Sequence, residues 1–192
     1  MPRSYRVRAA TERDLPGVRR CLRAAFEVYR PAYTRGAFRD TVLDAGTAKR
    51  RFREMRILVA VDRARSVVGT IAWRRTSPTE AHLRGMAVVP AQQGTGVAQS
   101  LLDRVLADLV RAGVRRVTLN TTPPLRRAVR FYRRNGFRRS GRTADFFGMV
   151  LTGYVRALGR RRRLPTSVRS SEEDPRRTGD RSASGSSSDN LI

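Results

Sequence analysis

A glycine-rich turn between a strand pattern and an amphipathic helix pattern restricts the fold of this 192-residue chain more than any other feature. Apolar alternation at 81–89 predicts a strand, and after Pro90 the glycines Gly94 and Gly96 precede a predicted helix at 97–111. Glycine lets successive backbone N–H groups converge on one point, and the free N–H groups of the first helical turn add partial positive charge. The pattern is typical of a phosphate-binding loop, although an ordinary tight turn also produces it.

Two well-known phosphate-binding classes do not fit this turn. A Walker loop needs a Gly-Lys-Ser/Thr run at the start of the helix, and none follows Gly96. A dinucleotide-binding fingerprint needs a third glycine and an acidic residue about 20 positions later, and both are absent. If the turn binds phosphate, it belongs to another class of strand–loop–helix unit.

The remaining apolar pattern predicts a mixed α/β fold. Three consecutive strands before the glycine turn indicate an antiparallel meander, and a β-loop-α-β unit follows them. We expect strands at residues 5–7, 57–61, 67–73, 81–89, 114–119 and 147–155. We expect a helix between Thr11 and Pro31, one or two short helices within 31–56, and further helices at 97–111 and between Pro123 and Asn135.

A shift in composition near residue 155 divides the chain. Residues 1–155 hold the predicted elements and are expected to form one domain of ordinary size. Residues 156–192 contain four consecutive arginines at 160–163, then acidic and serine-rich stretches with few apolar residues, and are expected to be a disordered tail. A basic anchor for nucleic acid or an anionic surface is the alternative interpretation of the four arginines.

Few residues are available for metal or disulfide chemistry. Cys21 and His82 are the chain's only cysteine and histidine, so neither a disulfide nor a structural zinc site is expected. Cys21 lies beside the apolar stripe of the first helix pattern and is expected to be buried. No apolar run approaches the roughly 20 residues of a membrane-spanning helix, and the first residues lack the apolar block of a signal peptide. We therefore expect a cytoplasmic protein, monomeric or homodimeric.

Two spaced motifs carry a resemblance to a known enzyme family. Residues 88–97 read Val-Val-Pro-Ala-Gln-Gln-Gly-Thr-Gly-Val, and Ala128, Tyr132, Gly136 and Phe137 follow the spacing A-x-x-x-Y-x-x-x-G-F. Both resemble signatures of the GCN5-related N-acetyltransferase (GNAT) superfamily, and a looser likeness extends over nearly the whole predicted domain. The resemblance implies an α/β acetyltransferase fold, in which a mixed central sheet is flanked by helices and its fourth and fifth strands splay apart.

The same resemblance implies a cosubstrate and the residues that hold it. Acetyl-coenzyme A (acetyl-CoA) would lie between the splayed strands, with its pyrophosphate in the glycine turn and with no metal. The implied cofactor-binding residues are Met86, Ala87, Val88, Gln92, Gln93, Gly94, Thr95, Gly96 and Val97. The implied activity is direct transfer of the acetyl group, within a ternary complex, to a primary amine of a small molecule, a protein N-terminus or a lysine.

Two residues are candidates for the proton transfers of this reaction. An acceptor ammonium must lose a proton before it attacks the thioester, and His82, with an ordinary pKa of about 6.5, is the candidate base. Family members place a histidine or a glutamate in the corresponding part of this strand. Tyr132 is implied as the acid that protonates the departing coenzyme A thiolate. Glu80 is the second candidate base, and a purely structural role is the alternative for His82.

The chain is strongly basic, with 41 basic residues, among them the single lysine Lys49, against 16 acidic ones, and a formal net charge of +25. This charge favours nonspecific contact with polyanions, and acidic or phosphorylated acceptors over polyamines. The codon composition of the genome explains the arginine excess equally well. A noncatalytic acyl-CoA sensor or a basic nucleic-acid-associated module is the alternative to an enzyme, although the interleaved aromatic residues of single-strand binders are absent.

Overall fold

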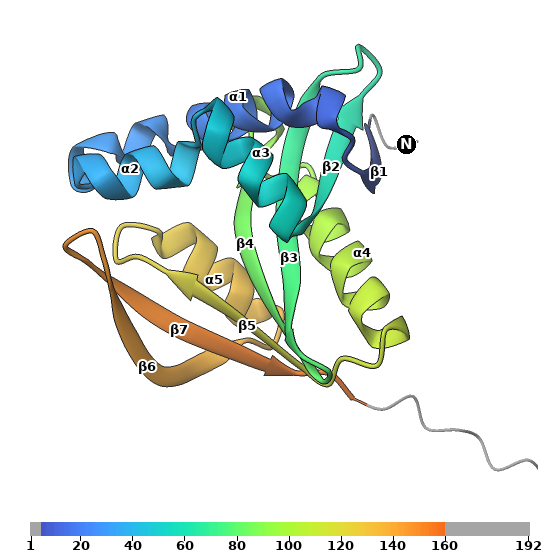
Figure 1. Cartoon of the computed structure of the whole chain (residues 1–192), viewed down its shortest axis with the longest axis vertical. Helices are drawn as coiled ribbons and strands as arrows, with labels where there is room; N and C mark the ends of the chain where they lie inside the picture. The colour runs from blue at the N-terminus through green and yellow to red at the C-terminus, as the bar shows by residue number, and fades with distance from the viewer. Residues whose placement is uncertain (1–4, 160–192) are drawn as a thin grey trace, which may run out of the picture. The chain divides into compact units, whose positions relative to one another are not determined.

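The computed structural model of the chain describes residues 5–159. Within them, seven strands form one sheet in the order β1-β2-β3-β4-β5-β7-β6 (Figure 1). The strands are β1 (Tyr5–Ala9), β2 (Arg56–Asp62), β3 (Val67–Ser77), β4 (Glu80–Val88), β5 (Arg116–Thr121), β6 (Arg138–Phe146) and β7 (Met149–Ala157). The α-helices are α1 (Leu15–Phe26), α2 (Arg35–Val42), α3 (Ala45–Glu54), α4 (Val97–Arg111) and α5 (Arg126–Arg134). Short 3-10 turns are η1 (Glu12–Asp14), η2 (Glu27–Ala32) and η3 (Pro90–Gln92).

The first half of the sheet is an antiparallel meander, as the sequence predicts. β1 pairs with β2, β2 with β3 and β3 with β4, each in antiparallel orientation. Successive residues of β2 belong alternately to two apolar clusters: Leu58 and Ala60 to one, Ile57 and Val59 to the other. Because side chains alternate along a strand, this pattern shows that both faces of the sheet are covered here.

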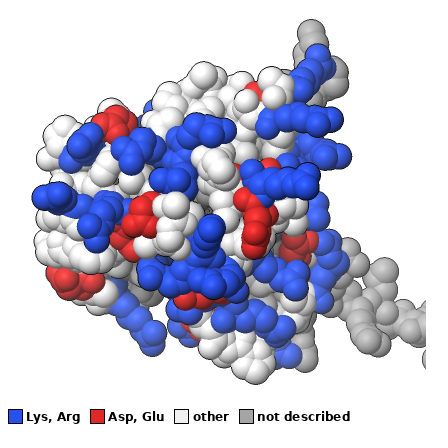
Figure 2. All heavy atoms as spheres, turned by 45° about the horizontal axis from the view of Figure 1, so that its top comes forward, with Lys and Arg blue, Asp and Glu red and all other residues white. Residues whose placement is uncertain are grey.

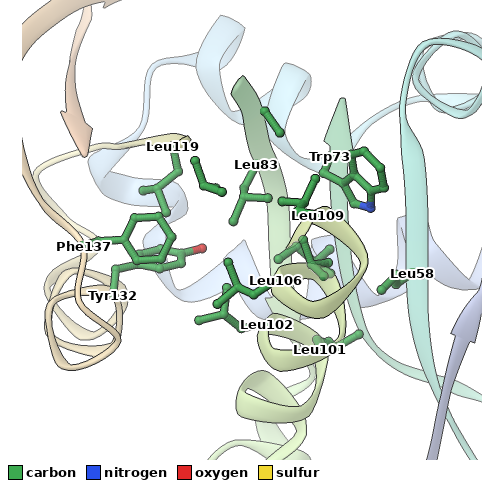
Figure 3. Packing of buried hydrophobic residues seen from close by; sticks show 14 of the residues in the cluster. Leu58, Trp73, Leu83, Leu101, Leu102, Leu106, Leu109, Leu119, Tyr132 and Phe137 are labelled. Atoms are coloured by element: carbon green, nitrogen blue, oxygen red, sulfur yellow. The ribbon is translucent and has the colours of Figure 1, made fainter. Parts of the chain in front are cut away.

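Each face of the sheet is covered by different helices. α4 packs on one face, where Leu102 and Leu109 are completely buried in the same cluster as Leu83 of β4 (Figure 3). α1 packs on the other face, where its residue Leu22 clusters with Val59 of β2. Two short helices, α2 and α3, form where one or two were predicted within 31–56, and they lie with α1 on this second side (Figure 1).

β4 and β5 are parallel neighbours over four residues and then separate. Their register runs from Glu80 opposite Arg116 to Leu83 opposite Leu119. Beyond this point no backbone pairing joins the two strands within residues 5–159, and Figure 1 shows them diverging from their paired end. The predicted splay of the fourth and fifth strands is confirmed.

A β-bulge lies in β4 where the separation begins. The register with β3 shifts so that Gly85 and Met86 together lie opposite Ile71. Gly85 has a φ of +63°, a left-handed conformation that favours glycine. The extra residue reverses the alternation of side chains, so Leu83 before the bulge and Met86 after it both pack on the α4 side of the sheet.

Two strands, and not the single one predicted at 147–155, complete the sheet. β6 and β7 form an antiparallel hairpin, and β7 also pairs with β5. The prediction missed β6 because none of its residues is buried and most are exposed, so no apolar alternation marks the strand. Phe147 and Gly148, with φ values of 52° and 81°, make the two-residue turn between the strands.

The ends of other elements differ from the prediction by a few residues. The strand predicted at 114–119 is β5, which begins two residues later because Val114 is buried in the turn that follows α4. β7 ends at Ala157 and Leu158 is also buried, so ordered structure continues past the predicted boundary at residue 155. Most of the predicted tail lies outside the described residues. In the part that the structure describes, none of the helices has the length and apolar character needed to traverse a bilayer.

Candidate active site

The glycine turn keeps its backbone open to solvent. Gly94 and Gly96 have φ values of +85° and +90°, and Gly96 caps the N-terminus of α4. No neighbouring heavy atom lies within 4 Å of the position that a Cβ atom of Gly94 would occupy. The N–H of Ser100 makes the first bond of α4, to the Gly96 carbonyl at 3.0 Å, so the N–H groups before it have no helical acceptor. These features fit a pyrophosphate, which needs free N–H donors and close backbone approach.

Side-chain hydrogen bonds hold the turn in shape. The amide of Gln93 donates to the Val88 carbonyl at 3.1 Å, and the hydroxyl of Thr95 donates to the Gln92 carbonyl at 2.8 Å. Arg127 of α5 donates to the Gln93 side-chain oxygen at 3.1 Å. The turn is therefore fixed both to the end of β4 and to α5.

One cleft of about 880 Å³ extends from the glycine turn, along the separated strands, to α1–α3. The predicted site residues that line it are His82, Met86, Ala87, Val88, Gln92, Gln93, Gly94, Gly96 and Tyr132. Thr95 and Val97 do not line the cleft. Val97 is completely buried, and its methyl group lies 2.6 Å from the position that a Cβ atom of Gly69 would occupy, so only glycine allows β3 and α4 to approach this closely.

His82 lies in the paired half of β4, and its ring is held in one orientation. The Thr118 hydroxyl of β5 lies 3.0 Å from Nδ1 of His82 and donates to the Ala81 carbonyl at 3.3 Å. Because that hydroxyl has one proton, its oxygen accepts from Nδ1–H, which leaves Nε2 with the free lone pair. Burial lowers the pKa of His82, Arg84 and Arg74 lower it further, and Glu80 raises it. The ring is therefore neutral near pH 7.

Tyr132 of α5 points its hydroxyl toward the sheet (Figure 3). The hydroxyl donates to the sulfur of Met86 at 3.2 Å, across the gap that separates β4 from β5. The ring packs edge-on against Phe131 and Phe137, each with a centroid distance of 5.5 Å. Burial raises the pKa of Tyr132 above its ordinary value, so the phenol keeps its proton.

Glu80 and Cys21, which were also considered from the sequence, and Asn120 of β5 lie as follows. Glu80 does not line the cleft, and its carboxylate pairs with Arg116 at 3.1 Å. Asn120 lines the cleft, and its backbone lies opposite Gly153 of β7. Cys21 is buried, as predicted, and burial raises the pKa of its thiol to about 12, so it is a packing residue.

The sequence analysis missed a group of charged residues on the α2–α3 side of the cleft. Asp40 of α2 accepts an ion pair from Arg84 of β4, and its Oδ2 lies 3.9 Å from Nη2 of Arg51 in α3. Nη2 of Arg51 also donates to the Asp40 backbone carbonyl at 3.3 Å. No sequence signal marked these residues, because the segment 31–56 is weakly periodic and arginines are common throughout the chain.

Positive charge dominates the cleft lining. The charged lining residues are Arg50, Arg51, Arg74, Arg84, Arg127 and Arg134, with Asp40 and Glu54. Figure 2 shows basic side chains spread over one face of the molecule, with fewer acidic ones between them. Within residues 5–159, no group of three or more His, Cys, Asp or Glu side chains could hold a metal ion. The arrangement therefore suits an anionic ligand held by arginines and backbone N–H groups.

Comparison with known proteins gives a family match that covers this site. The family model described as the acetyltransferase (GNAT) family matches residues 18–137, which include the glycine turn, His82 and Tyr132. An uncharacterized N-acetyltransferase of Mycobacterium tuberculosis is 30% identical over 104 residues, which span 52% of this chain and 67% of that protein.

Solved structures of similar fold include two that contain a coenzyme A species. The PaiA N-acetyltransferase from Thermoplasma acidophilum, in complex with coenzyme A, has a TM-score of 0.68 and 14% sequence identity, over 81% of this chain and all of that one. The yncA protein of Salmonella typhimurium, with its cofactor acetyl-CoA, has a TM-score of 0.61 and 18% identity, over 82% of this chain and 95% of that one. At these identities the likeness shows the shared fold.

Proposed function

The chain belongs to the acetyltransferase (GNAT) family and is an acetyl-CoA-dependent acyltransferase, and on this premise we propose that its acceptor is a primary amine. One observation carries the proposal. The glycine turn, His82 and Tyr132 all border a single cleft, at the place where β4 separates from β5. A thioester donor and an amine can therefore meet between a base and an acid.

The residues of β4 beyond the bulge would hold the cosubstrate. Met86, Ala87 and Val88 line the cleft where β5 no longer pairs with β4, so the backbone groups on that side, apart from the Val88 carbonyl that accepts from Gln93, have no strand partner and can bond a ligand. The glycine turn would take the pyrophosphate, and Arg127 and Arg134 add positive charge along the cleft. Acetyl-CoA supplies the activated acetyl group when it is bound.

His82 is the proposed base. Its Nδ1–H is held by Thr118, and its lowered pKa leaves Nε2 unprotonated near neutral pH, as a base that removes a proton from an ammonium must be. Its ring lines the cleft, whereas Glu80 lies outside the lining and pairs with Arg116. This difference favours His82 over Glu80 for the role.

Tyr132 is the proposed acid. Its hydroxyl reaches across the gap to Met86, one of the residues that would line the arm of the cosubstrate. The raised pKa of the phenol keeps a proton available for the coenzyme A thiolate, which becomes basic as the acetyl group leaves it. His82 would then take a proton from the acceptor ammonium, and Tyr132 would give one to the coenzyme A thiolate.

The experiment measures acetyl-CoA binding by calorimetry, and coenzyme A release with a panel of primary amines, for the wild type and for Gly94→Glu. A carboxylate at this position lies beside the proposed pyrophosphate site, and like charges about 4 Å apart cost roughly 1–4 kcal/mol. We therefore expect the variant to bind acetyl-CoA at least ~5-fold more weakly. Burial of Cys21, with its raised thiol pKa, keeps the background low in a thiol assay.

Gly113→Glu is the matched control. Gly113 also has a positive φ, of 78°, and open space at its Cβ position, but it follows the other end of α4 and does not line the cleft. The Gly113→Glu protein should bind acetyl-CoA as tightly as the wild type does. Equal binding by wild type and Gly94→Glu would contradict the placement of the pyrophosphate, and failure to acetylate any primary amine would contradict the proposed acceptor class.

A further inference from the structure

Two arginines share one carboxylate on the side of the cleft that the cosubstrate residues leave free. Arg84 and Arg51, from β4 and α3, both face the carboxylate of Asp40 in α2. All three residues line the cleft. One carboxylate cannot neutralise two guanidinium groups, so the cluster keeps a net positive charge where an acceptor would enter.

Arg51 retains hydrogen-bond donors that the protein does not use. Its side chain is only 9% exposed, and within residues 5–159 its only hydrogen bond runs from Nη2 to the Asp40 carbonyl. Nε and Nη1 therefore have no protein acceptor, although the residue lines the cleft. Burial, together with Arg84, lowers the pKa of Arg51 to about 10, so the group is still charged at neutral pH. A buried, charged group with free donors is matched by an anion from outside.

Arg84 lies close to the proposed base. It follows His82 by two residues in the regular part of β4, ahead of the bulge, so both side chains lie on the same face. At the rise of a strand, their Cα atoms are about 6.6 Å apart. A ligand with its anionic group on the arginines would therefore hold an amine, a few bonds away, beside His82.

We propose that Arg51 and Arg84 bind a carboxylate of the acceptor, so that the substrates are amines of the amino-acid class; this rests on the proposed function. The Asp40 carboxylate pairs with Arg84 and lies 3.9 Å from Nη2 of Arg51, so the two guanidinium groups are close enough to face one carboxylate. A polycationic amine without an anionic group is repelled by the arginines, which outnumber Asp40 and Glu54 in the cleft lining. Three aromatic side chains also line the cleft and favour an apolar remainder: Phe26 of α1, Tyr29 of η2 and Tyr33, which follows η2.

The experiment compares matched acceptors at saturating acetyl-CoA. L-Phenylalanine and L-leucine are measured against their carboxamides, which keep the amine and the side chain but lack the charge. The amine of the amide loses its proton more readily, so a preference for the free acid cannot arise from amine basicity. We expect the acids to have the higher kcat/KM, and Arg84→Met to raise their KM by ~10- to 100-fold, with no comparable rise in the KM of the amides.

Two further variants separate binding from structure. Arg51→Met should have the same effect as Arg84→Met. If the Arg51 variant does not fold, the Arg84 variant alone tests the proposal, because Arg84 is 43% exposed and its loss should not disturb the core. Arg111→Met removes an exposed arginine of α4 that pairs with Asp108 and does not line the cleft, so it should leave every acceptor unchanged. Equal kcat/KM for acids and amides, or equal loss for both in Arg84→Met, would overturn the proposal. A preference for phosphoethanolamine over every carboxylate would overturn it too.

Calorimetry with L-phenylalanine and coenzyme A-saturated protein distinguishes this proposal from the proposed function. Binding that Arg84→Met abolishes, in a protein that acetylates no amine, would support the carboxylate site and overturn the amine-acetylating function. Acetylation of amines without any carboxylate preference would support that function and overturn the carboxylate site. Absence of both binding and acetylation of any carboxylate would also overturn the site.

Discussion

The cleft has two walls that the chain builds in different ways. The cofactor wall, formed by Tyr132 and by the cleft-lining residues of the segment 86–96, comes mainly from one continuous stretch of chain and offers backbone groups to a ligand. The acceptor wall, which comprises Asp40, Arg51, His82 and Arg84, is assembled from three elements and offers side chains. Changes in the first wall should therefore affect every acceptor equally, whereas changes in the second should depend on the acceptor.

The largest expected effect is that of His82→Ala, which removes the base from the acceptor wall. We expect kcat to fall by about 10²–10⁴-fold, because the acceptor ammonium then has no positioned group to take its proton. Acetyl-CoA affinity should not change, since the cofactor wall is intact. Steady-state kinetics and calorimetry measure the two quantities separately.

His82→Gln is the control for a structural role of this residue. Its amide can still donate to Thr118, but it cannot take a proton at neutral pH. If His82 is the base, both variants lose kcat to a similar extent. Wild-type turnover by the glutamine variant would show that His82 has only a structural role, through its packing and its hydrogen bond to Thr118.

Tyr132→Phe should have the next largest effect, on the cofactor wall. Loss of the hydroxyl removes the proton donor for the leaving thiolate, and we expect kcat to fall by about 10²-fold, by the same factor for every amine. Tyr154→Phe is the matched control, because Tyr154 is also buried but does not line the cleft. Parallel kinetics with two unrelated amines check the prediction, and a loss confined to one of them would contradict it.

The smallest expected effect is a shift in pH dependence. The acidic limb of kcat should follow protonation of His82, whose pKa burial and the charges of Arg84 and Arg74 hold below the ordinary value, against the opposing effect of Glu80. Arg84→Gln removes one positive charge, so the pKa of His82 should rise and the limb should move to higher pH. A kcat profile at saturating acceptor measures this shift. An unmoved or oppositely moved limb would argue against His82 as the titrating base.

The secondary structure of the cofactor wall could be predicted from the sequence because its requirements are local. A left-handed turn needs Gly94 and Gly96, and the helix register fixes Tyr132 relative to Gly136, so short spacings carry the information. The splay of β4 and β5 followed from family resemblance and not from the residues alone. Periodicity does not report where two parallel strands stop pairing.

The acceptor wall and β6 could not be read from the sequence, for two different physical reasons. Asp40 and Arg84 are separated by 44 positions and meet only through folding, and an arginine that lines a cleft looks like any other in so basic a chain. β6 has no buried face to produce an alternating pattern. β6 is a strand because its backbone pairs with that of β7, and no pattern within its own residues marks this pairing.

The bulge at Gly85 determines which residues of β4 lie on each face of the sheet, and so which of them would face each proposed ligand. Before it, the even-numbered His82 and Arg84 lie on the face opposite the α4-packed Leu83, and after it the even-numbered Met86 lies on the α4 face itself. One strand would thus present one set of side chains to the acceptor and another to the cosubstrate. If Gly85 instead paired as an ordinary strand residue, the residues after it would exchange faces, whereas substitutions at 82 or 84 leave the frame of the cofactor half intact.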